Sequence, residues 1–230
     1  MKNSLDISTL MAATVHDVKN SLSVIDDQIQ GVIDEIAVDS PEAAQKLSRI
    51  RLEAGRINNG LVHMLGLYRL NSETFMPNFE EVLVEDVIRD ATSRYTDTLS
   101  ALGVKLSMEQ EDPDLIWFMD PVLVEGILAN VLTNSIRYTT DHLIFRVEER
   151  DGGLSIRITD NGAGYPEKMM NFMGEGGDQG DINFQNGSTG LGLFFCYQTA
   201  RLHKNGDREG FIQLTNDPET GGAVFELWLP

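Results

Sequence analysis

Four short motifs contain the residues of this chain that are best suited to chemistry. Between them they supply a histidine beside a carboxylate, two amides four residues apart, a carboxylate followed by glycines, and a glycine-rich segment before a helix. In chain order they read His16-Asp17-Val18-Lys19-Asn20, Asn130-Val131-Leu132-Thr133-Asn134, Asp160-Asn161-Gly162-Ala163-Gly164 and Ser188-Thr189-Gly190-Leu191-Gly192-Leu193. Each motif alone has an ordinary structural explanation. Any inference about function therefore rests on the order and spacing of the four motifs.

His16 can act as a nucleophile near neutral pH, because a neutral imidazole keeps a nitrogen lone pair available. It follows Val15, which belongs to an apolar seam, so we expect it at the accessible flank of a helix. Asp17 could orient the ring or accept its proton, and Asn20 lies one helical turn away on the same face. The motif predicts a phosphoacceptor, and the alternative is a surface His-Asp pair.

Asn130 and Asn134 lie on one face of a helix that begins at Asp120, because they are four residues apart. Amides on an otherwise apolar helix are costly unless they have partners, and Mg²⁺ carrying phosphate oxygens is such a partner. Arg137 and Tyr138 follow about one turn later, where they could meet phosphate and a nucleobase. The alternative is a helix whose buried asparagines bond to neighbouring groups.

Asp160 ends a strand and opens a tight Asn-Gly turn. Gly164 is needed less for the turn than for close approach of the backbone to a flat ligand, and a buried Asp160 could accept a hydrogen bond from an adenine amino group. Gly190 and Gly192 expose backbone N–H groups at the start of a helix, which suits an anion, with simple capping as the alternative. Together the motifs predict the metal, adenine and phosphate contacts of an ATP site.

The N-terminal part is predicted to be a helical hairpin. Residues 4–38 and 41–70 each carry apolar residues at alternating spacings of three and four, which is a heptad seam. A two-helix hairpin leaves one seam exposed, and pairing of two hairpins into a four-helix bundle would cover it. We therefore expect a homodimer through residues 4–70, with a generic coiled-coil dimerisation module as the alternative.

A linker at residues 71–78 should lead into an α/β sandwich over residues 79–230, which makes the whole chain α+β. This part alternates strand-like and helical runs, so we expect helices on one face of a mixed sheet. The expected strands are 79–84, 104–108, 115–119, 143–149, 154–159, 211–215 and 223–229, and the expected helices are 85–102, 121–138 and 191–203. The glycine-rich stretch at 165–190 has no periodicity, which is typical of a lid or of disorder.

Composition limits the remaining possibilities. The formal net charge of −18 argues against nonspecific nucleic-acid binding. No apolar run approaches 18 residues and no signal peptide is evident, so we expect a cytoplasmic protein without a membrane span. The single cysteine, Cys196, excludes an intramolecular disulfide and should lie in the core. His63, His142 and His203 are expected to be structural.

On these motifs the chain resembles the sensor histidine kinases of two-component systems, from about residue 5 to the C-terminus. The matching segments are His16 to Leu22 (H box), Asn130 to Tyr138 (N box), Asp160 to Gly164 (G1 box), Ser188 to Leu193 (G2 box) and Gly221 to Phe225 (G3 segment). The resemblance implies a dimerisation and histidine-phosphotransfer hairpin at 1–70 followed by a Bergerat-type ATP-binding domain at 79–230.

The resemblance also implies an ATP-dependent protein-histidine kinase. His16 would take the γ-phosphoryl group of ATP, with Asp17 as general base, and Asn20 would position water for dephosphorylating a partner. Asn134, helped by Asn130, would bind Mg²⁺. Adenine and the phosphates would be bound by Asp160, Arg137, Tyr138, Gly162, Gly164, Thr189, Gly190, Leu191 and Gly192. The phosphoryl group would pass to an aspartate on a response-regulator receiver domain.

Three departures from the family pattern bear on this interpretation. Ser21 stands where the family often has proline, so the first helix should lack a kink. Ser188 replaces the first glycine of the G2 box. Residues 169–200 contain no Lys or Arg but three acidic residues, Glu175, Asp178 and Asp181, and such a lid would repel ATP if it closed on the nucleotide.

Two other functions fit the same residues. One is a histidine phosphotransfer protein with a vestigial ATP domain, which the acidic lid favours and the intact Asn134 and Asp160 oppose. The other is a non-catalytic module whose hairpin binds and inhibits a partner. Only 15 residues precede His16, so a stimulus would arrive through a separate sensor protein or through further segments of a longer chain.

Overall fold

The computed structural model describes residues 7–70, 75–171 and 191–230. The chain divides into two compact units, Met1–Met76 and Pro77–Pro230. None of the described helices is both long enough and apolar enough to cross a membrane.

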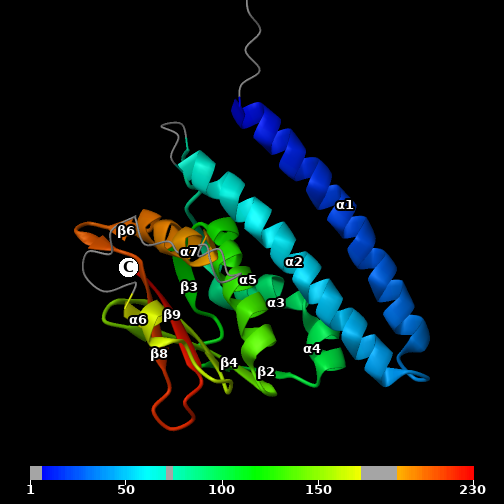
Figure 1. Ribbon diagram of the computed structural model, residues 1–230. Coiled ribbons are helices and arrows are strands. Elements are labelled where there is room, and N and C mark those ends of the chain that lie inside the picture. Colours follow the sequence, from blue (N-terminus) through cyan, green and yellow to red (C-terminus); the bar gives the residue numbers. More distant parts are fainter. Residues whose placement is uncertain (1–6, 71–74, 172–190) are drawn as a thin grey trace, which may run out of the picture. The chain divides into compact units, whose positions relative to one another are not determined.

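The first unit is the predicted helical hairpin. Helix α1 (Ile7–Ile36) and helix α2 (Pro41–Leu70) pack against each other (Figure 1). This packing covers only part of the predicted seam, and residues beside the seam make much of the contact. The most buried apolar side chains of the hairpin are Val15, Ile33, Ala44 and Leu52.

Several positions of the predicted seam are uncovered within one chain. Ile25 and Val32 of α1 are each 44% exposed, and Ile50 and Ile57 of α2 are 55% and 58% exposed. Each pair is seven residues apart, so each pair forms a stripe along one side of its helix. We refer to Ile25, Val32, Ile50 and Ile57 as the outer stripe.

The second unit is built on a mixed five-stranded sheet of order β2-β4-β5-β9-β8. Its strands are β2 (Lys105–Gln110), β4 (His142–Arg150), β5 (Gly153–Asp160), β9 (Ala223–Leu229) and β8 (Phe211–Asn216). Strands β2 and β4 are parallel, and the other neighbours are antiparallel. The prediction of a mixed sheet is therefore confirmed.

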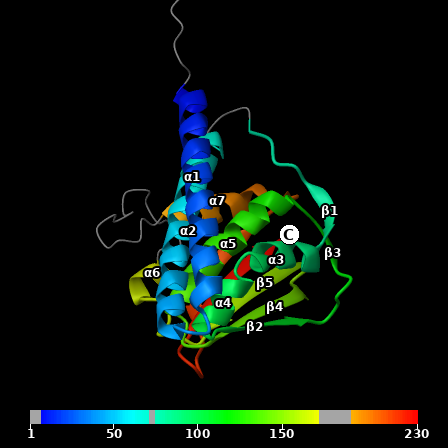
Figure 2. The same ribbon diagram turned by 90° about the vertical axis from the view of Figure 1, so that its right-hand side faces the viewer.

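Helices α3 (Val84–Ser93), α5 (Pro121–Tyr138) and α7 (Leu191–Leu202) pack together on one face of this sheet (Figure 2). Helix α5 lies in the middle and contacts both α3 and α7. The core forms between α5 and the sheet, where alternate strand residues point inward. Fully buried side chains there include Ile127, Leu128, Leu132, Phe145, Ile156 and Phe225.

The predicted helix at 85–102 is wrong, because the structure has two helices there, α3 and α4 (Thr96–Leu102). The hydroxyl groups of Thr92 and Ser93 bond to backbone carbonyls of their own turn, to those of Ile88 and Asp90, respectively. Such bonds compete with continuation of a helix. The chain turns at this point, and Tyr95 is buried.

Two predicted strands do not join the main sheet. Strands β1 (Glu80–Leu83) and β3 (Ile116–Met119) pair with each other as a separate antiparallel ribbon. Helix α6 (Glu167–Asn171) and the short hairpin of β6 (Lys204–Asn205) and β7 (Arg208–Glu209) were not predicted, because each is too short to show a period.

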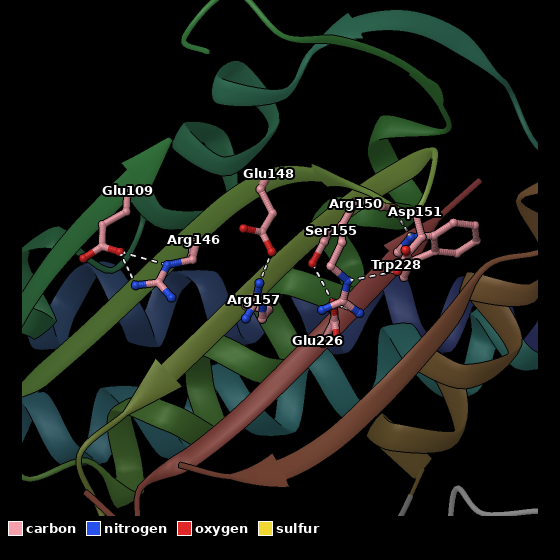
Figure 3. A network of polar contacts seen from close by, with 9 residues as sticks. All are labelled: Glu109, Arg146, Glu148, Arg150, Asp151, Ser155, Arg157, Glu226 and Trp228. Atoms are coloured by element: carbon pink, nitrogen blue, oxygen red, sulfur yellow. Dashed lines mark hydrogen bonds and ion pairs between the residues drawn. The ribbon is translucent and has the colours of Figure 1, made fainter. Parts of the chain in front are cut away.

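The face of the main sheet opposite α5 carries ion pairs (Figure 3). Arg146 donates to Glu109, and Arg157 donates to Glu148. Glu226 accepts from both Arg150 and Ser155, at 3.0 and 2.6 Å. Trp228 covers this end of the face, where it stacks on Phe211 and Arg208 lies over its ring.

Candidate functional site

Helix α5 positions the asparagine pair. Asp120 caps the helix by accepting the N–H of Leu123 at 3.0 Å, and Pro121 occupies its first turn. Asn130 is only 8% exposed, and Asn134, one turn later, is partly exposed. The structure thus gives the two amides different surroundings on the same helix.

The amide of Asn130 lies at the contact between α5 and α7. Its Nδ2 donates to Cys196 Sγ at 3.3 Å. A Cβ atom on Gly192 would lie 2.2 Å from Asn130 Oδ1, so the first turn of α7 approaches this amide closely only because residue 192 is glycine. Burial raises the pKa of the Cys196 thiol to about 12, so the thiol stays protonated in the core as expected.

Asp160 is a buried carboxylate with unequal oxygens. Oδ1 accepts the N–H groups of Gly162 at 2.9 Å and Ala223 at 3.1 Å. Oδ2 accepts from none of the residues that the structure describes. Because the side chain is only 5% exposed, this second oxygen is suited to a donor from a bound molecule, such as an amino group.

The glycines of the Asp160 loop have a structural reason that the sequence analysis did not give. A Cβ on Gly162 would lie 2.2 Å from the carbonyl oxygen of Tyr138, at the end of α5. Gly164 has φ +78°, and a Cβ there would lie 2.4 Å from the carbonyl oxygen of Gly221. These glycines let the loop pack on α5 and on the β8–β9 connection, whether or not a ligand lies close to them.

Asn161 holds the same loop in place and was missed as a site residue. Its Oδ1 accepts the hydroxyl of Thr139 at 2.9 Å and the N–H groups of residues 140–142 at 3.2 Å, and its Nδ2 donates to Asp141. The connection after α5 is thereby tied to the Asp160 turn. Only the turn propensity of Asp-Asn-Gly was visible in the sequence, because these partners are distant along the chain.

Arg137 and Tyr138 lie in the last turn of α5. The guanidinium of Arg137 lies 5.3 Å from the centre of the Tyr138 ring, and Tyr138 is largely exposed. Leu191 and Gly192 begin α7. The predicted residues Thr189 and Gly190, with Ser188 and the acidic stretch at 175–181, lie outside the described residues.

Tyr165 is a second residue that the sequence analysis overlooked. It directly follows Gly164, and its backbone exchanges two hydrogen bonds with the side chain of Asn216 on β8. Burial raises the pKa of its phenol, and the charge of Asp160 raises it further. The loop that starts at Asp160 is thus fixed on β8 at Tyr165.

The hairpin carries the other predicted group on α1. His16 and Asp17 are exposed, with side-chain values of 70% and 84%. Nδ1 of His16 lies 3.5 Å from Asp17 Oδ1 and 3.3 Å from Asn20 Nδ2. Its Nε2 has no hydrogen-bond partner among the described residues, so this nitrogen can meet an incoming electrophile.

The three remaining histidines have structural surroundings, as expected. His203 is buried: its Nε2 accepts the N–H of Asp120 at 3.2 Å, and its Nδ1 lies 3.1 Å from the carbonyl oxygen of Thr199. Burial lowers the pKa of His203 below its usual value. His142 contacts Ser107, and His63 is buried in the hairpin.

The same Asp120 also binds the start of the second unit. Its Oδ2 accepts the N–H of Asn78 at 2.8 Å, and Phe79 packs edge-on against His203. The carboxylate of Asp120 therefore joins the incoming chain to the beginning of α5. The backbone N–H of Asp120 bonds to His203, directly after the end of α7.

Comparison with known proteins gives consistent matches. Residues 119–230 match the family described as histidine kinase-, DNA gyrase B- and HSP90-like ATPase. The chain is 25% identical over 225 residues to the sensor protein KdpD of Escherichia coli, covering 97% of this chain and 24% of that protein. It is 27% identical over 199 residues to the sensor-like histidine kinase SenX3 of Mycobacterium tuberculosis, covering 84% and 47%.

A solved structure has the same fold along most of the chain. The histidine kinase AdeS of Acinetobacter baumannii aligns with a TM-score of 0.59 at 20% identity, covering 93% of this chain and 96% of that one. The chain spans about a quarter of the length of KdpD and about half that of SenX3.

Proposed function

Since the chain is a relative of the sensor histidine kinases and residues 119–230 form an ATP-binding domain of the histidine kinase-, DNA gyrase B- and HSP90-like type, we propose that it is an ATP-dependent protein-histidine kinase. It transfers the γ-phosphoryl group of ATP to His16 and then to an aspartate of a response-regulator receiver domain. The observation that carries the proposal is the buried carboxylate of Asp160. Its Oδ1 accepts two backbone N–H groups, and its Oδ2 has no donor among the described residues.

The nucleotide is bound by the groups around α5 and α7. Asp160 accepts the 6-amino group of adenine, and Arg137 and Tyr138 meet the phosphates and the base from the end of α5. Thr189, Gly190, Leu191 and Gly192 present backbone N–H groups to the phosphates.

The amides suit Mg²⁺, which prefers hard oxygen ligands and keeps several waters. Asn134 is the principal ligand because it is partly exposed. Asn130 already donates its Nδ2 to Cys196, so only its Oδ1 is left to help. When bound, the ion neutralises phosphate charge, which this acidic chain otherwise does little to offset.

His16 is the nucleophile. With its proton on Nδ1, facing Asp17, the lone pair of Nε2 attacks the γ-phosphorus, the bond from that phosphorus to the bridging oxygen breaks, and ADP leaves. Asp17 stabilises and then accepts the Nδ1 proton as the ring becomes a neutral phosphohistidine. Asn20, on the same face, positions water when the partner is dephosphorylated.

The outer stripe supports a homodimer through residues 4–70. Two stripes at heptad spacing, each formed of half-exposed branched side chains, match what a second hairpin would cover in a four-helix bundle. The hairpin would then serve both dimerisation and phosphotransfer.

Incubation with γ-labelled ATP and Mg²⁺ tests the proposal. Wild-type protein should acquire acid-labile, base-stable label that is absent from His16→Ala and that moves to an added receiver domain. His142→Ala, which alters a partly buried structural histidine of the other unit, should keep the label. ATP binding without label would instead favour a module that binds and inhibits a partner. Absence of ATP binding, with label arriving only from another phosphoprotein, would favour a phosphotransfer protein.

A further inference from the structure

We propose that Cys196 is a positioning residue for the metal site: its thiol holds the amide of Asn130 with Oδ1 turned toward the start of α7, where that oxygen can help to bind Mg²⁺. The inference rests on the proposed function and extends it, because it gives a role to a buried side chain that itself touches neither the metal nor the nucleotide.

The orientation of the Asn130 amide follows from three hydrogen-bonding groups in a row. The first is the backbone carbonyl oxygen of Ile127, which can only accept. Cys196 Sγ lies 4.0 Å from this oxygen and donates its proton to it. The thiol keeps that proton, because burial raises its pKa to about 12. The sulfur is then left as an acceptor, and Asn130 Nδ2 donates to it at 3.3 Å.

The other end of the same amide has no protein partner. Among the residues that the structure describes, none donates a hydrogen bond to Asn130 Oδ1. Asn130 is only 8% exposed, and a Cβ on Gly192 would lie 2.2 Å from this oxygen, which places Oδ1 against the first turn of α7. The oxygen is not fully enclosed, so a bound group can reach it. A largely buried amide oxygen of this kind is normally satisfied by water or by a ligand.

A reversed amide would not suit a metal ion. It would present its NH₂ donors where Mg²⁺ requires an oxygen ligand. Asn134, the principal ligand in the proposed site, is partly exposed and has no contact with the thiol among the described hydrogen bonds. Loss of the thiol should therefore weaken the part of nucleotide binding that depends on the metal, and should leave the adenine contacts unchanged.

Calorimetric titration with ATP, once with Mg²⁺ and once with EDTA, tests the role of the thiol. The ratio of the two affinities isolates the contribution of the metal. Cys196→Ala removes the acceptor of Asn130 Nδ2, so the ratio should fall about fivefold, the effect of one net hydrogen bond, while the affinity in EDTA stays at the wild-type value. Cys196→Ser can still donate to Ile127 and accept from Asn130, so it should keep the wild-type ratio.

Two further variants separate orientation of the amide from packing of α7. Thr199→Ser removes one carbon from an equally buried side chain of the same helix, whose hydroxyl has no hydrogen-bond partner among the described residues, and it should keep the wild-type ratio. Cys196→Val fills the space of the thiol but cannot accept a hydrogen bond, so it should lower the ratio as alanine does. It also replaces the alanine variant if that variant fails to fold.

Each outcome decides the question. An unchanged ratio in folded Cys196→Ala or Cys196→Val, or an equal fall in Cys196→Ser or Thr199→Ser, overturns the role of Cys196 and leaves ATP binding intact. Equal affinity of wild type for ATP with Mg²⁺ and with EDTA overturns it in the same way. Failure of wild type to bind ATP at all would instead remove the proposed function, and this inference with it.

Discussion

Asp160 holds its own loop in place and, in the proposed site, also binds the nucleotide. Its Oδ1 closes the loop on Gly162 and Ala223, and its Oδ2 has no donor among the described residues. A substitution that changes Oδ2 but keeps Oδ1 can therefore separate ligand binding from stabilisation of the loop.

Asp160→Asn makes that separation. The amide oxygen can still accept both backbone N–H groups, but the other position becomes an amide donor facing the amino group of adenine. We expect ATP affinity to fall at least tenfold, since a hydrogen bond to a charged group contributes about 1.5–3 kcal/mol. Calorimetry measures the affinity, and thermal unfolding should show the fold retained. Wild-type affinity in this variant would contradict the assignment of the adenine site.

At the scale of elements, α5 and α7 meet through a contact that depends on one glycine. Gly192 lies against the amide of Asn130, and the same amide donates to Cys196 further along α7. The distance between the two helices therefore determines how far the backbone at the start of α7 lies from Asn130.

Gly192→Ala should disturb this spacing. The new Cβ would lie 2.2 Å from Asn130 Oδ1, so one helix must shift, and overpacking of this kind costs about 1–3 kcal/mol. Unfolding in urea should show the loss of stability, and nucleotide affinity should fall with it. In the control, Gly31→Ala on α1, the added Cβ meets no atom within 4 Å and should leave both properties unchanged or stabilise the hairpin.

His203 makes the junction of α5 and α7 sensitive to acid. Burial lowers its pKa in the folded state, so below the unfolded value of about 6.5 the unfolded chain binds a proton that the folded chain does not. Its contribution to stability is thus present above about pH 6.5 and is lost as the pH falls toward the folded pKa. Urea unfolding at pH 7.5 and 5.5 should show that acid lowers the free energy of unfolding more in wild type than in His203→Gln. An equal decrease in both proteins would rule out this role of His203.

The elements also show what sequence reasoning could and could not reach. Long periodic segments such as α2 and α5 were predicted with their bounds, because their hydrophobic spacing is local information. The break at Thr92–Tyr95 depends on side-chain bonds that propensity alone does not reveal. The strand order β2-β4-β5-β9-β8 and the partners of Asn161 and Tyr165 depend on contacts between residues far apart in the chain.

At the scale of the whole molecule, the outer stripe bears on assembly. Ile57 is 58% exposed in a single chain, yet it occupies a seam position of α2. Ile57→Glu should convert a dimer into a monomer without unfolding the hairpin, because the charge would be buried only in the dimer. Sedimentation gives the mass and circular dichroism the helix content. Val24→Glu, at an equally exposed apolar position outside the seam, should remain dimeric; loss of the dimer in both variants would argue against the stripe.

The anchor at Asp120 has a mechanical consequence. Asn78 is the second residue of the unit that begins at Pro77, and its N–H is held by Asp120 at the beginning of α5. Tension on the incoming chain is therefore resisted about 20 Å, at 1.5 Å per residue, from Asn134 near the other end of that helix. A force on the incoming chain therefore acts first on the Asp120 carboxylate, at the opposite end of α5 from Asn134, the proposed magnesium ligand.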